Sequence, residues 1–203
     1  MQKKYLFLVS SFASLPLLLN ACGILSPAVT PTVKQYQITA AAAASDAPAC
    51  KAVNSAILQV SQVQVFAPYD TKNMYYSESQ YQLNNYSLNQ WATQPSSMFT
   101  QAVLQKLLQS CIYSNVVSSD FVATAKYRLV MQLMDFKQII NGNDASMNLT
   151  LLAELIDNTT NQVIKSKTFS ETSPTTPNAQ GYIAGANAAT AQLLSDLTAW
   201  LGS

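Results

Sequence analysis

Hydrophobic and polar positions follow two different periodicities along this chain. After Trp91 and again after Pro177, apolar residues recur every three or four positions, as in a helix with one buried face. Elsewhere apolar and polar residues alternate, which is typical of a half-buried strand. The pattern therefore predicts two main helices and a sheet, whose alternating runs are Ile57–Phe66, Tyr127–Phe136, Met147–Leu155 and Val163–Phe169.

Turn residues separate the predicted strands. Asn141–Asp144 contains Asn-Gly, a strong hairpin signal, and Asn158–Asn161 is a second polar turn. The last three runs therefore form an antiparallel meander. The first run changes phase between Val60 and Val63, which predicts a bulge or burial on both faces.

Shorter strands complete the predicted sheet. Lys34–Ile38 is one, and Met74–Tyr76 with Tyr81–Leu83 would form a hairpin. Thr175–Pro177 is expected to open the last helix. We therefore predict an α+β fold, a largely antiparallel sheet with two main helices packed on one face, in a single domain over residues 34–203.

The first residues carry a different pattern. Lys3 and Lys4 precede an apolar stretch that extends to Leu19 and is interrupted by serines and Pro16, the layout of a secretory signal over residues 1–21. Spanning a bilayer takes about 20 mostly apolar residues, and this stretch is shorter. A permanent helical anchor is therefore not expected.

Cys22 stands where the apolar stretch ends, with the small residue Ala21 before it. This arrangement resembles the bacterial lipoprotein signal, which implies that Cys22 becomes the acylated N-terminus of the mature protein. The alternative is an ordinary secretory signal that happens to contain a cysteine. Gly23 in place of aspartate favours, by the same resemblance, the outer membrane, and residues 22–33, with Pro27 and Pro31, form a tether.

Charge excludes some partners. Beyond the signal the chain has nine basic residues, eleven minus the two near its start, against ten acidic ones, so its net charge is close to minus one. No basic field exists to attract nucleic acid. Asn, Gln, Ser and Thr replace charges on the expected surface, which suits lasting contact with a partner.

The two remaining cysteines, Cys50 and Cys111, are an even number in an oxidising compartment. We predict a disulfide between them, and two separate buried thiols are the alternative. A metal site is not expected, since the chain has no histidine and no third thiol nearby. No cofactor is expected either.

Catalytic chemistry is sparse. Without histidine, neither a Ser-His-Asp triad nor a Cys-His dyad can form, and glycines are too few for a phosphate-binding loop. Asp135 and Glu154 would be neighbours across the meander and could act as an acid and base pair, although such carboxylates are more often solvated. We therefore expect a protein that is not an enzyme.

An aromatic-rich stretch comprises Tyr75, Tyr76, Tyr81, Tyr86 and Trp91. Packing within the sheet, with hydroxyl groups at the rim, is one interpretation. A partner-binding surface is the other, because Tyr and Trp are favoured at interfaces. The sequence does not decide between them.

The order of these elements resembles a known family. The order begins with a lipidated cysteine, a Tyr-x-Ile strand, a strand ending near Pro68-Tyr69-Asp70 and a segment from Leu83 to Trp91. It continues with a helix, the strand Leu129–Phe136, hairpins and a terminal helix with Trp200-Leu201. This order is similar to that of the ABC-type transport auxiliary lipoprotein component family. That family includes the paraquat-inducible protein C lipoprotein.

This resemblance implies a periplasmic lipoprotein that is the non-catalytic partner of a transport system. Such a system contains mammalian-cell-entry-domain proteins and moves lipids between the inner and outer membranes. Two alternatives remain: a carrier domain that itself holds a phospholipid between helices and sheet, and a carboxylate-dependent hydrolase. The oligomeric state is open, with a homo-oligomer among the options.

Overall fold

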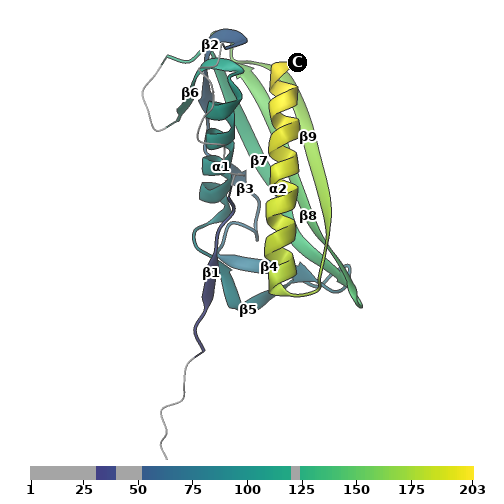
Figure 1. The fold of residues 1–203 in the computed structure, drawn as a ribbon. Helices are drawn as coiled ribbons and strands as arrows, with labels where there is room; N and C mark the ends of the chain where they lie inside the picture. The colour runs from purple at the N-terminus through teal and green to yellow at the C-terminus, as the bar shows by residue number, and fades with distance from the viewer. Residues whose placement is uncertain (1–30, 40–51, 120–123) are drawn as a thin grey trace, which may run out of the picture. The chain divides into compact units, whose positions relative to one another are not determined.

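A computed structural model describes residues 31–39, 52–119 and 124–203, and the described residues from Thr32 onward form one α+β domain (Figure 1). Two helices, α1 (Pro95–Ser110) and α2 (Ala179–Gly202), accompany a single sheet. The predicted fold class is confirmed. The strands are β1 (Lys34–Tyr36), β2 (Asn54–Val60), β3 (Gln64–Val65), β4 (Asn73–Ser77), β5 (Asn84–Trp91), β6 (Tyr113–Ser118), β7 (Tyr127–Asn141), β8 (Asp144–Asp157) and β9 (Gln162–Thr175).

The long strands are antiparallel, as the turn signals predict. β7 pairs with β8 and β8 with β9 along nearly their whole lengths, and Gly142 joins β7 to β8 with a φ of +64°. On its other side β7 pairs in parallel with three short strands, β2, β3 and β4. The sequence pattern did not predict these parallel pairings, because a two- or three-residue pairing leaves no signal of direction.

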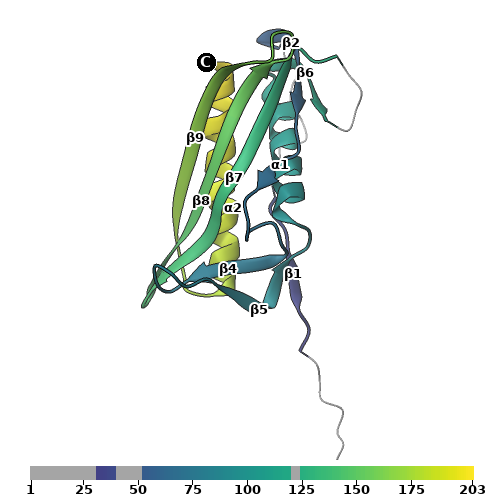
Figure 2. The same cartoon turned by 180° about the vertical axis from the view of Figure 1, so that it is seen from behind.

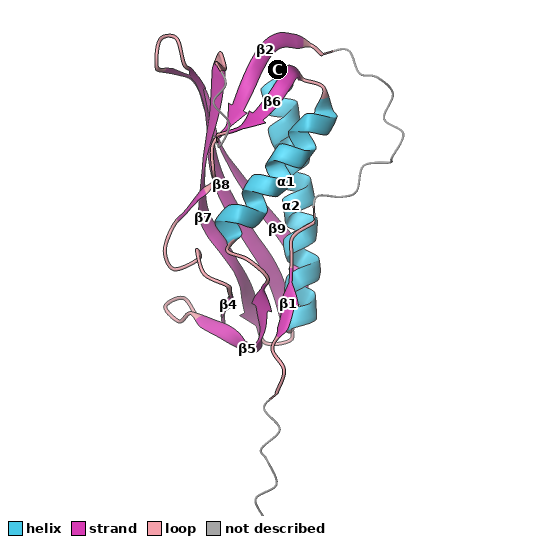
Figure 3. Ribbon diagram, turned by 90° about the vertical axis from the view of Figure 1, so that its left-hand side faces the viewer, coloured by secondary structure: helices cyan, strands magenta, loops and turns pink. Residues whose placement is uncertain are grey.

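Both helices lie on the same face of the sheet (Figure 3), and the view from behind shows the opposite face of β7, β8 and β9 without a helix over it (Figure 2). Pro95 begins α1, where a missing N–H is tolerated. Asn178, rather than Thr175–Pro177, opens α2: its side-chain oxygen accepts a hydrogen bond from Gly181 N, because β9 continues to Thr175.

The short strands differ from the predicted ones at two places. At the phase change after Val60 the predicted strand is interrupted, so that β2 and β3 are separate strands. Between them, Val63 N donates a hydrogen bond to Thr100 Oγ1 on α1 at 2.8 Å. The predicted second hairpin strand at Tyr81–Leu83 is wrong, since β5 begins at Asn84. The Ser77 hydroxyl lies 2.7 Å from Gln82 O and holds this connection as a turn.

Glycine lets α2 approach the sheet closely. A Cβ at Gly185 would lie 2.8 Å from Met147 Cβ on β8, and one at Gly181 would lie 2.7 Å from Thr176 N. The spacing of these two glycines, which resembles a membrane helix motif, therefore serves packing on the sheet.

Aromatic rings fill the space between helices and sheet. Trp91, 0% exposed, stacks on Phe136 with 5.4 Å between ring centroids, and Phe99 and Tyr182 meet Phe136 edge-on. Leucines and methionines of β7 and β8 extend this core. The alternating residues of the meander and the helical stripes thus meet in one layer, as predicted.

The buried side chain of Gln138 forms hydrogen bonds with two other parts of the domain. Gln138 on β7 is 0% exposed. Its Oε1 accepts a hydrogen bond from Tyr86 OH at 2.7 Å, and its Nε2 donates to Thr175 Oγ1 at 2.7 Å and to Thr176 O at 2.8 Å. All of its amide groups are therefore paired, and β5, β7 and the segment before α2 are linked.

Replacing Gln138 with leucine is expected to lower the free energy of unfolding by about 2–4 kcal/mol, because the hydroxyl groups of Tyr86 and Thr175 and the carbonyl group of Thr176 lose their hydrogen-bond partner. Urea unfolding measures the change. Gln132→Leu is the matched control, since Gln132 is on the same strand but is only half-buried and meets Gln64 at 3.5 Å. Equal losses for the two variants would contradict the role of the network.

Candidate functional site

The N-terminal segment of the domain is held by contacts with α2. Ile38 is buried, Thr39 N donates to Asn187 Oδ1 on α2 at 2.9 Å, and Gln180 Nε2 donates to Tyr36 OH at 3.0 Å. Residues 34–39, which follow the predicted tether, therefore contact both the sheet and α2. Cys22 lies outside the described residues, so its lipidation stays a prediction.

Cys111 ends α1 in a left-handed conformation with a φ of +56°. Its carbonyl oxygen accepts a hydrogen bond from Val53 N at 3.2 Å, so the chain passes beside Cys111 three residues after position 50. Cys50 itself lies outside the described residues. The proximity of Val53 supports the predicted disulfide without testing it.

Free-thiol counting under denaturation tests this disulfide. We expect no reactive thiol at Cys50 or Cys111 in the oxidised protein and two after reduction. Closure of this long loop is expected to contribute about 4 kcal/mol to stability through the unfolded chain. Two thiols that react without a reductant would contradict the prediction.

Three of the candidate tyrosines lie on the adjoining strands β4 and β5 and are half-buried. Tyr76 packs on Tyr86 with 4.7 Å between ring centroids, and Tyr75 meets Tyr69 edge-on at 6.0 Å. Burial raises the pKa of Tyr86 to about 12, so its hydroxyl stays protonated as the donor to Gln138. These contacts agree with packing in the sheet.

The two other aromatic candidates, Trp91 and Tyr81, differ most in the exposed fraction of their side chains. Trp91 is 0% exposed and belongs to the core, so its side chain offers no surface to a partner. Tyr81, in the turn between β4 and β5, is 92% exposed. The aromatic stretch is thus not one surface, and partner binding by its half-buried members stays a prediction.

The expected pair of carboxylates does not form. Asp135 is opposite Thr150 and Glu154 is opposite Val130, which separates the two carboxylates by four residues, about 13 Å, along β8. Asp135 instead pairs with Lys137, whose Nζ is 2.7 Å from both carboxylate oxygens. A register shift at Met134, between Leu133 and Asp135, was not readable from the sequence.

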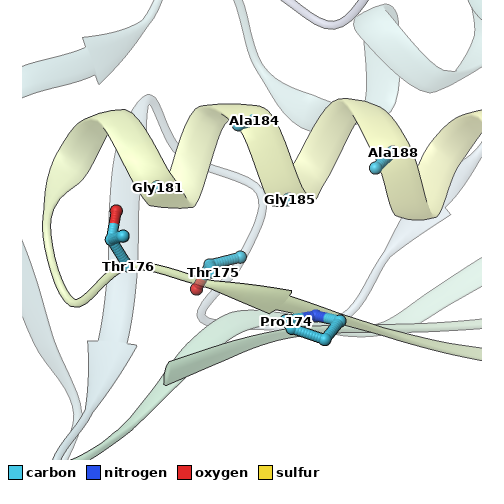
Figure 4. Close-up of a pocket in the computed structure, with 7 residues that line it drawn as sticks. All are labelled: Pro174, Thr175, Thr176, Gly181, Ala184, Gly185 and Ala188. Atoms are coloured by element: carbon cyan, nitrogen blue, oxygen red, sulfur yellow. The ribbon is translucent and has the colours of Figure 1, made fainter. Parts of the chain in front are cut away.

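Open grooves flank the two helices. One of them, about 470 Å³, runs between α2 and the end of β9 (Figure 4). Its floor is made by small residues of α2, and Pro174 closes it on the strand side (Figure 4). Two polar grooves of about 390 and 340 Å³ follow α1 and share Gln62. The described lining of these three grooves contains one ionisable side chain, that of Asp70.

Metal chemistry and membrane spanning find no support in the part of the chain that the structure describes. Over residues 31–39, 52–119 and 124–203, no three His, Cys, Asp or Glu side chains gather as metal ligands. Within the same ranges, neither α1 nor α2 is long and apolar enough to cross a bilayer.

Solved structures with the same fold are known. A crystal structure of protein XCC0632 from Xanthomonas campestris matches with a TM-score of 0.67 at 19% identity, over 84% of this chain and 91% of that chain. A crystal structure of an uncharacterized protein matches with a TM-score of 0.63 at 14% identity, over 84% of this chain and 99% of that chain. A PelC dodecamer from Paraburkholderia phytofirmans matches with a TM-score of 0.45 at 16% identity, over 72% of this chain and 91% of that chain. This similarity is too distant for the PelC assembly to bear on this chain.

The fold is a single sheet with two helices on one face, and its N-terminal strand is bound to α2. A family model described as the ABC-type transport auxiliary lipoprotein component matches residues 36–198, from the end of β1 into the last turns of α2. The chain therefore belongs to this family, as the order of its elements predicted. No curated protein matches the chain.

Proposed function

We propose that this protein is a periplasmic adaptor, anchored by lipid at Cys22 to the outer membrane, of an ABC-type transport system. The partner would be a mammalian-cell-entry-domain protein, and the cargo would be lipid moving between the inner and outer membranes. The adaptor itself does not catalyse a reaction. The family match over residues 36–198, which begins a short tether after a lipoprotein-like cysteine, carries this proposal.

The surface supports a docking role. Only 10% of the residues are charged, and the uncovered face of the meander carries serine, threonine and asparagine side chains such as Thr150, Ser170 and Thr172. Short hydroxyl side chains of this kind can be desolvated at an interface at lower cost than charges.

A carrier role fits the interior less well. Holding a phospholipid between helices and sheet takes an apolar cavity of several hundred cubic ångströms. In that layer the side chains of Phe99, Tyr182 and Leu193 are all 0% exposed and pack against the sheet. We therefore assign lipid handling to the partner.

Co-purification of the intact lipoprotein from its own membranes tests the proposal. We expect a mammalian-cell-entry-domain protein and its transporter to be recovered after mild cross-linking, and far less with Cys22→Ala, which should fold but leave the membrane. Recovery of the anchored protein without any transport component would contradict the adaptor role. Phospholipid retained in stoichiometric amount by the domain from Val33 onward would favour the carrier.

A further inference from the structure

The end of the domain that receives the tether exposes four large apolar side chains. Val33 is 40% exposed, Leu83 38%, Leu88 43% and Tyr81 92%. All four belong to β5, to the turn before it or to the residue before β1. They form what we call the tether-end surface.

Strand register brings the two parts of this surface together. Lys34 is opposite Asn89 in the parallel pair β1 and β5, which puts Val33 level with Leu88. Figures 1 and 3 show β1, β4 and β5 gathered at the end of the domain where β1 begins. Exposed apolar residues and the point of tether entry thus share one end.

The surface is supported from behind by fixed contacts. Tyr36 OH donates to Asn89 Oδ1 at 3.2 Å and Ala92 N donates to Tyr36 O at 2.7 Å, which joins β1 to β5. The hydrogen bond from Tyr86 to Gln138 fastens β5 to the centre of the sheet. The exposed side chains are therefore presented on a rigid strand pair.

Covalent reach keeps this end near the lipid. The chain advances eleven residues from Cys22 to Val33, at most about 40 Å when fully extended. The contact of Gln180 with Tyr36 places the start of α2 at this end, and the 24 residues of α2 span about 36 Å to the other. The far end could reach the bilayer only with the tether nearly fully stretched.

We propose that the tether-end surface of Val33, Tyr81, Leu83 and Leu88 rests in the headgroup region of the bilayer that anchors Cys22. The inference rests on the proposed lipidation. Tyrosine suits this depth because its ring is apolar and its hydroxyl stays hydrated. Lys34, which is exposed beside Val33, would lie among anionic headgroups. The anchor and this surface together fix the orientation of the domain, with its far end toward the periplasm.

Quenching by brominated lipid tests the contact. The acylated full-length protein is placed in vesicles of phosphatidylethanolamine and phosphatidylglycerol with brominated acyl chains. Tyr81→Trp and Leu88→Trp are expected to add fluorescence that is blue-shifted and strongly quenched in these vesicles, relative to the signal of the native tryptophans. Matched unfolding temperatures show that each variant keeps the fold.

Val163→Trp is the matched control. Val163 is 52% exposed, and Lys165, two residues on, binds Trp200 O near the end of α2, so this position lies at the far end. Its added fluorescence should be unaffected by bromine. Two outcomes would overturn the inference and leave the anchor intact, provided that the variants float with the vesicles. One is an absence of quenching at Tyr81→Trp and Leu88→Trp, and the other is equal quenching at Val163→Trp. Protein that fails to float would overturn both.

Discussion

The Cys22→Ala variant is expected to move from the membrane fraction to the soluble fraction almost completely. Each methylene of an acyl chain buried in a bilayer contributes about 0.8 kcal/mol, so several chains on one residue hold a domain firmly. Alanine accepts no acyl chain. The part of the chain that the structure describes offers no spanning helix to replace the anchor, and its few charges give little attraction to lipid headgroups.

Fractionation of cells and flotation of the extracted protein with vesicles measure this change. Ser26→Ala, a substitution in the tether that leaves Cys22 in place, is the matched control and should stay with the membrane. Membrane association of Cys22→Ala equal to that of the unaltered protein would contradict the proposed anchor.

The Trp91→Ala variant is expected to lose about 3–5 kcal/mol of unfolding free energy, because a large buried ring leaves a cavity that the core fills only in part. Trp91 is 0% exposed, stacks on Phe136 at 5.4 Å and meets Tyr182 at 5.7 Å. Domains of this size are stable by about 5–15 kcal/mol, so the loss is a large share of the total.

Thermal unfolding is expected to shift down by about 10 °C for Trp91→Ala. Tyr81→Ala is the control in the same aromatic stretch, and since Tyr81 is 92% exposed its change should stay within about 0.5 kcal/mol. A loss below about 1 kcal/mol for Trp91→Ala would contradict the placement of this ring at the centre of the core.

The strongly periodic elements were predictable from the sequence. The helical spacing of Phe99 and Val103 and the alternation from Met147 to Leu155 each record burial on one face, and both features were confirmed in α1 and β8. The Asn-Gly turn at Gly142 fixed the direction of the meander because its backbone conformation suits a hairpin.

Other features depend on contacts between distant segments and were not predictable. The parallel pairings of β2, β3 and β4 with β7 are too short to mark the sequence. Asp135 and Glu154 were expected to be neighbours, and the register between β7 and β8 separates them. Trp91 and Tyr81 look alike in a tyrosine-rich stretch, yet one is in the core and the other in a turn.

Some features of the candidate site were likewise predictable from the sequence and others were not. Lipidation at Cys22 and the tether stay predictions from local sequence, because the signal pattern is contiguous along the chain. The tether-end surface was missed because Val33 and Leu88 are 55 residues apart in the chain, and only the pairing of β1 with β5 brings them together. Isolated apolar residues in weak strands carried no signal of a shared surface.

Intact-mass analysis of the protein extracted from its own membranes tests the central claim most directly. We predict a chain that begins at Cys22 and carries the added mass of several fatty acyl groups. A chain that begins at another residue, or a Cys22 with an unmodified thiol and amine, would contradict the account of a lipid-anchored adaptor.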